Sequence, residues 1–272
     1  MCDSKIFTVC HGLSKKECAF WINRAEQRGF NDSSPSGGGH GRTGREDART
    51  SQFVVFQNEA KFANQLYNAV KRYLPADLTH LSSTGYITST ENAQKWKHVG
   101  VNPYVRVYKY EVGQKFPEHV DYKMCRKVYR NGEQYQQMTF MSLIVYLNDD
   151  FSGGHTGFWT QHDVIGKKEH CRFLRGVEHK PHDVVIQPEL GKIAIMDQNI
   201  LHEGLAPTKG VKYIIRTDII HERHIAMHAK LQKFKENSKQ IKKMNKKQTE
   251  QELNEEGEWE KLFETSCKNY AD

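Results

Sequence analysis

The sequence predicts an α+β fold with a mainly β core, in which helices pack against an antiparallel sandwich or barrel. From about residue 100 onward, short runs rich in β-branched and aromatic residues alternate with turns, and no helical periodicity lies between them. Before and after this region the pattern is helical instead. With 272 residues, the chain is long enough to bury a substantial core in one large domain or two small ones.

The first predicted helix covers residues 14–28. Ser14 is a favourable N-cap, and Glu17, three residues later, completes a capping box in which each side chain bonds the backbone of the other residue. Gly29 follows directly and is typical of a helix C-terminus. We therefore expect a helix whose two ends are both defined by local sequence.

A second helix is predicted over about residues 59–73, and Pro75 stops it. The segment between the two helices, residues 31–50, is rich in glycine, serine and charge. It lacks the G-K-[ST] ending and the preceding apolar strand of a phosphate-binding loop. We expect instead a long irregular loop that borders a site.

The predicted β core contains five strands joined by turns. After Ile220 the pattern returns to that of a helix. The sequence therefore divides into a domain at 1–222, with its β core at about 100–222, and a charged helical tail at 223–272. The strands are predicted at 104–110, 138–147, 183–188, 192–197 and 212–220.

Much of the net charge of +7 comes from a lysine-rich run between residues 230 and 247, which is followed by a glutamate-rich run between 250 and 260. A basic block next to an acidic one favours a solvated helical tail that pairs with itself. Contact with nucleic acid or with an acidic protein is the alternative.

Composition also bears on location. No apolar run approaches the roughly 18–20 residues that a membrane span needs. The N-terminal stretch carries charges within every apolar run, which is not the pattern of a secretory signal. The six cysteines include no C-x-x-C pair, so we expect free thiols. These features predict a cytoplasmic protein without a membrane contact, with the nucleus as the alternative location.

The segment FPEHVD, residues 116–121, contains the only His-x-acid triplet of the chain, formed by His119 and Asp121. Residues i and i+2 of a strand point to the same side, so both side chains can meet one metal ion. Two histidines and one carboxylate on one face of an octahedral ion form the facial triad of non-haem Fe(II) oxygenases, which leaves three positions open. The third ligand should be a histidine at the end of a later strand, and His202 meets this requirement.

The predicted strand at 212–220 places Lys212, Ile214, Arg216 and Asp218 on one face. Two cations on one face of an otherwise apolar strand are costly to bury without a partner. A dicarboxylate such as 2-oxoglutarate is such a partner, because one carboxylate can pair with a cation while the other end chelates the iron. The alternative is that this face is the solvated outside of the sheet, with Arg216 and Asp218 paired across it.

The chain resembles the prolyl 4-hydroxylase-like branch of the 2-oxoglutarate/Fe(II)-dependent dioxygenases in three runs, RVYKYEVGQKFPEHVDY, YLNDDFSGGHTGFW and VVIQPELGKIAIMDQNILHEGLAPTKGVKYIIRTDII. The resemblance extends over residues 5–222 and is closest over 104–220. It rests on six elements in the expected order. These are an R-x-Y-x-Y strand, G-Q-K-F before H-x-D, a Y-L-N strand that leads to G-G-x-T, a P-x-x-G turn, and H-x-G followed by K-G-x-K.

This resemblance implies a double-stranded β-helix core, of the jelly-roll or cupin type, flanked by the N-terminal helices. It implies that His119, Asp121 and His202 bind Fe(II). It also implies that Lys212, ten residues after the distal histidine, binds the far carboxylate of 2-oxoglutarate.

Three further residues are expected near 2-oxoglutarate. Tyr110 and Thr156 occupy positions at which members of the family contact this cosubstrate. Arg216, four residues after Lys212 on the same face, is the second candidate for a carboxylate, and an exchange of roles between the two cations is an alternative. The glycines of SGGHTGFW are expected to allow a close backbone approach near the cofactor, or else to form only a tight turn.

The resemblance implies an enzyme that uses Fe(II), 2-oxoglutarate and O2, supported by ascorbate, to hydroxylate an unactivated C–H bond with release of succinate and CO2. The strand after Lys212 continues as IIRTDII, where peptide prolyl hydroxylases usually have tryptophan or another apolar residue. Peptidyl-proline is therefore only one possible substrate. A free amino acid, a small metabolite and an intracellular protein are equally open. The sequence does not predict an oligomeric state.

Two other functions stay open. Oxidative demethylation of nucleic acid uses the same triad, and the basic tail together with Phe158 and Trp159 would then contact the nucleic acid. The sequence does not favour it, because the further arginines typical of such demethylases are missing. A non-catalytic barrel that binds a partner through its charged tail is the third reading, although all three ligand candidates and Lys212 are present.

Overall fold

The computed structural model describes residues 5–32, 50–79, 81, 89–163 and 181–225. The chain forms two compact units. The first unit contains Met1–Lys123 and Thr139–His221, and the second contains Met124–Met138 and Glu222–Asp272.

The described residues form fifteen strands, and all registers found between them are antiparallel. The strands are β1 Ile6–Val9, β2 Asn31–Asp32, β3 Gln52–Phe56, β4 Lys97–Val101, β5 Val105–Tyr110, β6 Phe116–His119, β7 Cys125–Arg130, β8 Glu133–Tyr146, β9 Ser152–Gly153, β10 Thr156–Asp163, β11 Val184–Ile186, β12 Ile193–Asp197, β13 Ile200–Gly204, β14 Pro207–Lys209 and β15 Lys212–Ile225.

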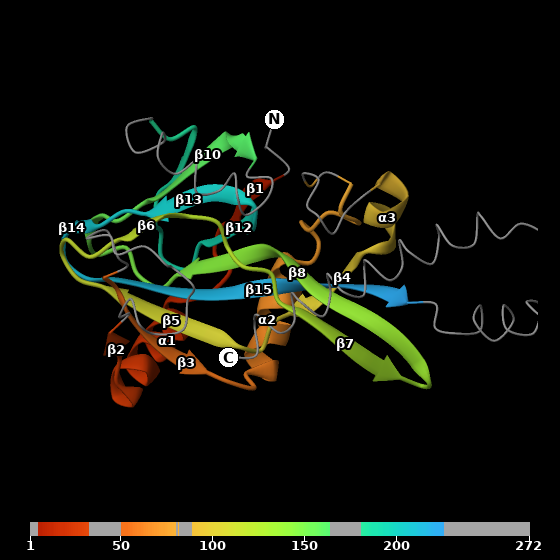
Figure 1. Ribbon diagram of the computed structural model, residues 1–272. Helices are drawn as coiled ribbons and strands as arrows, with labels where there is room; N and C mark the ends of the chain where they lie inside the picture. The colour runs from red at the N-terminus through yellow and green to blue at the C-terminus, as the bar shows by residue number, and fades with distance from the viewer. Residues whose placement is uncertain (1–4, 33–49, 80, 82–88, 164–180, 226–272) are drawn as a thin grey trace, which may run out of the picture. The chain divides into compact units, whose positions relative to one another are not determined.

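Two sheets dominate the first unit (Figure 1). The larger has the order β1-β12-β8-β15-β5-β3-β2, with β4 also paired to β15. The smaller has the order β11-β10-β13-β6, and a short third sheet pairs β14 with β9. Apart from β3-β2 and β11-β10, neighbouring strands within these sheets are not consecutive in the sequence, which is the strand order of a jelly roll rather than of a simple meander.

Helix α1 runs over Lys15–Arg28 and has the predicted ends. The Ser14 hydroxyl accepts a hydrogen bond from Glu17 N at 3.3 Å, and Ser14 N donates to the Glu17 carboxylate at 2.7 Å. Gly29 ends the helix with a φ of +81°, a conformation that favours glycine. The predicted capping box and C-terminal glycine are therefore confirmed.

Helix α2 covers Ala60–Val70, within the predicted range, and its last turn stops before residue 73. A third helix, α3, covers Thr90–Lys95 and was not predicted. Its N-cap Ser89 accepts a hydrogen bond from Asn92 N at 3.1 Å. This cap is the local signal that the prediction overlooked, and six residues are too few to show helical periodicity.

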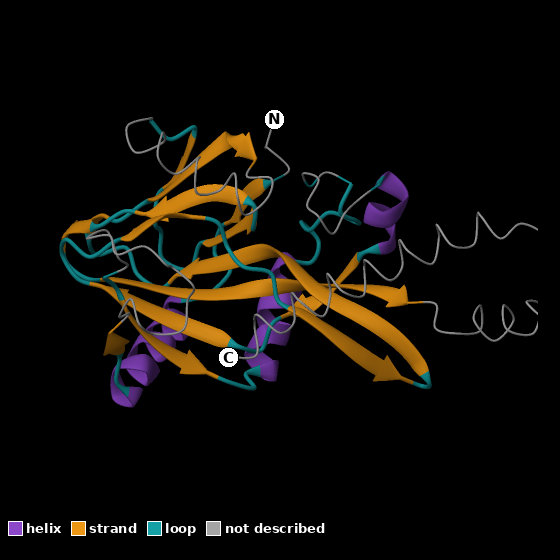
Figure 2. Ribbon diagram, viewed as in Figure 1, coloured by secondary structure: helices purple, strands orange, loops and turns teal. Residues whose placement is uncertain are grey.

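The large sheet separates two apolar cores in the first unit. On β5, Val105 and Val107 pack in the core that contains α1 and α2, whereas Tyr108 and Tyr110 pack in the core shared with β10 and β13. Figure 2 shows α1 and α2 on the side of the large sheet that faces away from the smaller sheet. The two facing sheets with helices on one outer side form a double-stranded β-helix, so the predicted fold class is confirmed.

The same alternation decides which face of β15 is buried. Ile215 and Ile219 belong to the core with the helices, and Ile214 belongs to the core between the sheets. Lys212 and Arg216 share the side of Ile214 and therefore point between the two sheets. The alternative of a solvated outer face is wrong for this strand, since only 1% of the Lys212 surface is exposed.

The second unit contains a β-hairpin of β7 with the first part of β8, closed by Asn131 and Gly132 at φ values of +52° and +78°. An Asn-Gly pair is the preferred two-residue hairpin loop because both residues tolerate positive φ. The prediction missed this signal and started the strand at residue 138 instead of Glu133.

Strand β15 continues to Ile225, five residues beyond its predicted end, so residues 223–225 are strand and not the start of a helix. The reason is a set of side-chain hydrogen bonds within the second unit, from Gln137 to Glu222 at 2.7 Å and from Arg223 to Gln136 at 2.8 Å. These hydrogen bonds pair the polar side chains of Glu222 and Arg223 within the sheet, whereas the local sequence pattern favours a solvated helix from this point.

Some predictions fall on parts of the chain that are not described. The glycine-rich loop lies largely at 33–49, and the remainder of the predicted tail lies at 226–272, both outside the described residues. Within those that are described, Cys10, Cys18 and Cys125 form no disulfide. The described helices include none with the length and apolar character required to cross a membrane.

Candidate active site

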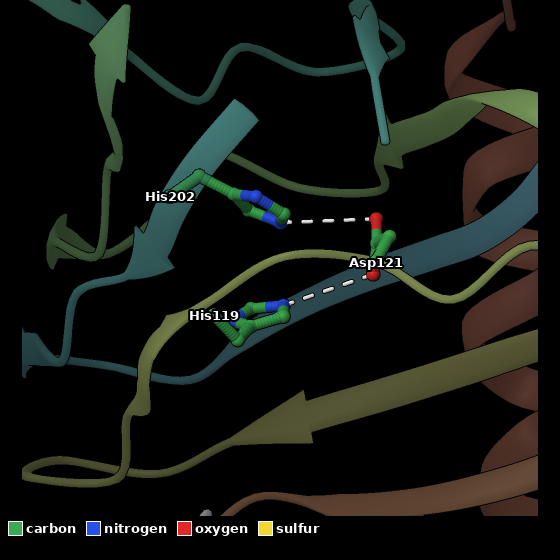
Figure 3. A group of neighbouring side chains, drawn as sticks. All are labelled: His119, Asp121 and His202. Atoms are coloured by element: carbon green, nitrogen blue, oxygen red, sulfur yellow. Dashed lines mark ion pairs between the residues drawn. The ribbon is translucent and has the colours of Figure 1, made fainter. Parts of the chain in front are cut away.

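The structure brings together the three predicted metal ligands. His119 is the last residue of β6, and its direct partner in the neighbouring strand β13 is His202. Asp121 follows two residues beyond β6, where its N–H donates to the Gln198 carbonyl at 3.0 Å. One ligand atom from each of the three residues lies within 4.8 Å of the others. Figure 3 shows both imidazole rings directed toward the carboxylate.

Both histidines present the same ring nitrogen to this centre. His119 Nδ1 lies 2.7 Å from the Pro117 carbonyl, and His202 Nδ1 lies 2.9 Å from the Ile200 carbonyl. A carbonyl oxygen only accepts, so each Nδ1 carries the proton and donates. Each Nε2 then faces Asp121, at 3.8 Å from one of its two oxygens. Such backbone acceptors fix the tautomer and orientation of metal-binding histidines.

The Asp121 carboxylate is held in its ionised form. Burial alone would raise the pKa of Asp121, but Arg216 in the first place, and then the two histidines and Ser142, bring that pKa well below its usual range. Arg216 Nη2 lies 3.1 Å from Oδ1, and the Ser142 hydroxyl donates to Oδ2 at 2.5 Å. The centre therefore offers two imidazole nitrogens and one negatively charged carboxylate.

Lys212 is a buried cation near this centre. Its Nζ donates to the Gly154 carbonyl at 2.6 Å and lies 5.0 Å from the ring centre of Tyr110, its direct partner on β5. Burial lowers the pKa of Lys212 from 10.5 to about 7, and no charged group among the described residues offsets this effect. A buried ammonium without an anion is unfavourable, so this position is suited to an incoming carboxylate.

The glycine pair before β10 shapes the Lys212 position. Gly154 has a φ of +68°, and a Cβ atom there would lie 3.2 Å from Lys212 Cδ and 2.8 Å from the Phe151 ring. The carbonyl of Gly154 can approach Lys212 because this side chain is missing. The predicted close backbone approach thus occurs at Gly154. Thr156 is also present, with its hydroxyl 2.7 Å from the Tyr146 hydroxyl.

Comparison with known proteins finds likenesses that centre on the β core. Residues 105–217 match the model of the 2OG-Fe(II) oxygenase superfamily. Over 123 residues the chain is 30% identical to probable prolyl 4-hydroxylase 10 of Arabidopsis thaliana, an alignment that spans 40% of this chain and 39% of that relative. The match therefore covers about two fifths of the relative's length.

Solved prolyl hydroxylases align with most of the chain at low identity. The viral collagen prolyl hydroxylase of Paramecium Bursaria Chlorella virus-1, in complex with 2OG, is 19% identical, with 80% of this chain and 96% of that chain covered and a TM-score of 0.44. The prolyl hydroxylase of Trichoplax adhaerens, in complex with a hypoxia inducible factor peptide fragment, is 13% identical, with 79% and 83% covered and a TM-score of 0.48.

The residues of this site fit Fe(II) and 2-oxoglutarate, the two groups named in the description of the matching superfamily model. Two imidazole nitrogens and one carboxylate are the donor set of the facial triad that binds non-haem Fe(II). The buried cation Lys212, which pairs with no anion among the described residues, suits the far carboxylate of a dicarboxylic acid. Both features lie between the two sheets of the double-stranded β-helix.

Sequence reasoning missed two polar residues of this site, Ser142 and Tyr146. Ser142 contacts Asp121, and Tyr146 contacts Thr156. Both lie on β8 with Ile144 between them, so they share the face that points toward the smaller sheet. The period of two within the predicted strand was the available signal, and the polar residues on its otherwise apolar inner face were the ones to select.

Proposed function

We propose that the chain is a 2-oxoglutarate- and Fe(II)-dependent hydroxylase, with residues 1–222 as the catalytic domain. It would insert oxygen into an unactivated C–H bond and release succinate and CO2. The observation that carries the proposal is the triad of His119, Asp121 and His202 together with Lys212, a buried cation that pairs with no anion among the described residues. Lys212 shares a face of β15 with Arg216, which contacts Asp121.

Each residue has a distinct proposed role. His119, Asp121 and His202 would hold the Fe(II), which together with 2-oxoglutarate and O2 supplies the oxidising power for hydroxylation. Lys212 would bind the far carboxylate of 2-oxoglutarate, with Tyr110 and Thr156 beside it. Burial of Lys212 excludes water from that carboxylate and so strengthens the ion pair. Ascorbate is proposed as the supporting reductant.

Lys212 is the better candidate of the two cations for 2-oxoglutarate. The Arg216 guanidinium already pairs with Asp121 and Asp218, each at 3.1 Å. Lys212 has no such partner among the described residues, and binding an anion there would remove an unfavourable charge. If the roles are exchanged, replacement of Arg216 will affect 2-oxoglutarate binding more than replacement of Lys212.

Peptidyl-proline is the first substrate to test, because the curated relative is described as a probable prolyl 4-hydroxylase. A free amino acid and a small metabolite stand beside it. The nucleic-acid alternative gains no support from the aromatic residues, since Phe158 and Trp159 are buried, with 0% and 4% of their surface exposed. Neither ring can stack on a base in this conformation.

An anaerobic titration with Fe(II) and 2-oxoglutarate tests the cofactor assignment. We expect a weak visible charge-transfer band in the wild-type protein and no band in His119→Ala. A folded wild-type protein that shows no band would contradict the proposal. Release of succinate, screened over proline peptides, free amino acids and methylated oligonucleotides, then identifies the substrate class.

A further inference from the structure

The geometry points to a buried clamp, formed by Asp218 and Arg216, that positions the Asp121 carboxylate for the metal. Arg216 would then act through Asp121 and would not be a second contact for 2-oxoglutarate. This inference rests on the proposed function, because it assigns Asp121 to a metal.

The centre of the clamp is one nitrogen of Arg216. Its Nη2 lies 3.1 Å from Asp121 Oδ1, 3.1 Å from Asp218 Oδ1 and 3.1 Å from the Ser142 hydroxyl. The same hydroxyl donates to Asp121 Oδ2 at 2.5 Å. Each oxygen of Asp121 therefore has one donor from the large sheet and still has acceptor capacity on its other side.

Asp121 needs such support because it lies beyond the end of β6. The ladder between β6 and β13 ends with the pair of His119 and His202, so no strand pairing fixes Asp121. Its backbone N–H is held by the Gln198 carbonyl at 3.0 Å, but its side-chain torsions depend on what the carboxylate contacts. Two donors from one side orient the carboxylate toward the two histidine Nε2 atoms, each 3.8 Å away.

The far end of the clamp is anchored as well. Gln198 Nε2 donates to Asp218 Oδ1 at 2.9 Å, and the Asn102 amide lies 3.5 Å from Asp218 Oδ2. Gln198 thus contacts the clamp through its side chain and Asp121 through its backbone. Thr139 donates to the Gln198 side chain at 3.2 Å and connects this contact to β8. A substitution of Asp218 should therefore alter the position of Arg216 and, through it, that of the Asp121 carboxylate.

The three buried charges of the clamp stabilise one another. The side chains of Asp121, Arg216 and Asp218 are 11%, 14% and 7% exposed, so each charge needs a partner. Another arginine, Arg106, is the direct partner of Arg216 on β5, and two like charges in that position repel each other. The two aspartates offset this repulsion, and loss of Arg216 would leave two carboxylates close together.

The test is Mn(II) titration of the metal-free protein, followed by 2-oxoglutarate titration at saturating Mn(II). Outer contacts of metal ligands typically contribute about 10–100-fold to metal affinity, so Arg216→Gln should weaken Mn(II) binding by about that factor. Its affinity for 2-oxoglutarate at saturating metal should stay close to that of the wild type. Arg216→Lys keeps the charge but not the planar donor group, and should recover part of the Mn(II) affinity.

Asp218→Asn and Arg106→Gln complete the set. Asp218→Asn keeps the side-chain shape, removes the anchoring charge, and should weaken Mn(II) binding less than Arg216→Gln does. Arg106→Gln removes a second arginine from the same face of the sheet, one that acts on Asp218 but does not contact Asp121, so it should weaken Mn(II) binding less than Arg216→Gln does. Thermal unfolding of each metal-free variant shows whether it is folded.

Several results would overturn the inference. Arg216→Gln with wild-type Mn(II) affinity and weakened 2-oxoglutarate binding would make Arg216 a cosubstrate contact. Equal losses in Arg216→Gln and Arg106→Gln would show a general effect of charge removal. If Arg216→Gln does not fold, wild-type Mn(II) affinity in both Arg216→Lys and Asp218→Asn overturns it. A wild-type protein that binds no metal would instead refute the proposed function itself, and the clamp with it.

Discussion

Replacement of Lys212 with methionine removes the buried ammonium and keeps most of the side-chain volume. In the wild type, burial lowers the pKa of Lys212 from 10.5 to about 7, and within the described residues its hydrogen-bond partner is the Gly154 carbonyl. The far carboxylate of 2-oxoglutarate would supply the missing anion and form a charge-assisted hydrogen bond in a site that excludes water. The variant loses this bond and leaves the bound carboxylate without a cation.

The size of the effect follows from the burial. Loss of one partner from a buried, hydrogen-bonded charge pair costs about 2–5 kcal/mol, and about 1.4 kcal/mol corresponds to a tenfold change in Kd. The affinity of Lys212→Met for 2-oxoglutarate should therefore fall by roughly 30-fold to several thousand-fold. Its affinity for Mn(II) should hardly change, because Lys212 contacts none of the three metal-binding candidates.

Calorimetric titration of the Mn(II)-loaded protein with 2-oxoglutarate measures this affinity. Lys192→Met is a matched control, since Lys192 is also largely buried but pairs with Glu189 outside the site. It should bind 2-oxoglutarate as the wild type does. Wild-type affinity in Lys212→Met, together with a large loss in Arg216→Gln, would refute the assignment of Lys212.

Three further predictions concern Lys212, Gly154 and Ser14. The unfolded chain binds more protons than the folded one between the folded pKa of Lys212, about 7, and its ordinary value of 10.5. The free energy of unfolding of the ligand-free protein should therefore rise with pH across this window, and urea denaturation should show a smaller rise in Lys212→Met; equal slopes would contradict the assigned burial. Gly154→Ala places a Cβ atom against Phe151 at a φ of +68°. This variant should lose about 1–3 kcal/mol of stability and bind 2-oxoglutarate more weakly. An unchanged melting temperature would show that the turn adapts to the new side chain. Ser14→Ala removes the cap of α1 and should cost about 0.5–2 kcal/mol in thermal unfolding with no effect on 2-oxoglutarate affinity; a loss of that affinity would contradict a purely local role.

The features that were predictable from the sequence depend on neighbouring residues or on short periodic patterns. The capping box of Ser14 and Glu17 needs only a spacing of three residues, and it formed as predicted. The shared face of Lys212 and Arg216 follows from the period of two along a strand, and both point between the sheets. The same period of two also places Ser142 and Tyr146 on the inner face of the predicted strand at 138–147, although the prediction did not select them.

The features that the sequence did not predict depend on contacts between distant segments. Asp121 and Arg216 are 95 positions apart, and only the pairing of the strands shows that the guanidinium lies on the carboxylate. The sequence allowed a pairing of Arg216 with Asp218, but it could not show that Asp121 completes the cluster. Strands β10 and β13 were not predicted, because glycine and polar residues interrupt their apolar pattern. They are defined by their pairing with each other.

The central claim is the proposal that this protein converts 2-oxoglutarate and O2 at the site formed by His119, Asp121 and His202. The most direct test is to incubate the Fe(II)-loaded protein with 2-oxoglutarate and isotopically labelled O2, with a proline peptide and then the other substrate classes, and to analyse the succinate by mass spectrometry. The account predicts succinate that carries one labelled oxygen atom, and none above background with His119→Ala. Protein that binds Fe(II) and 2-oxoglutarate but forms no labelled succinate with any of these substrates would contradict the claim.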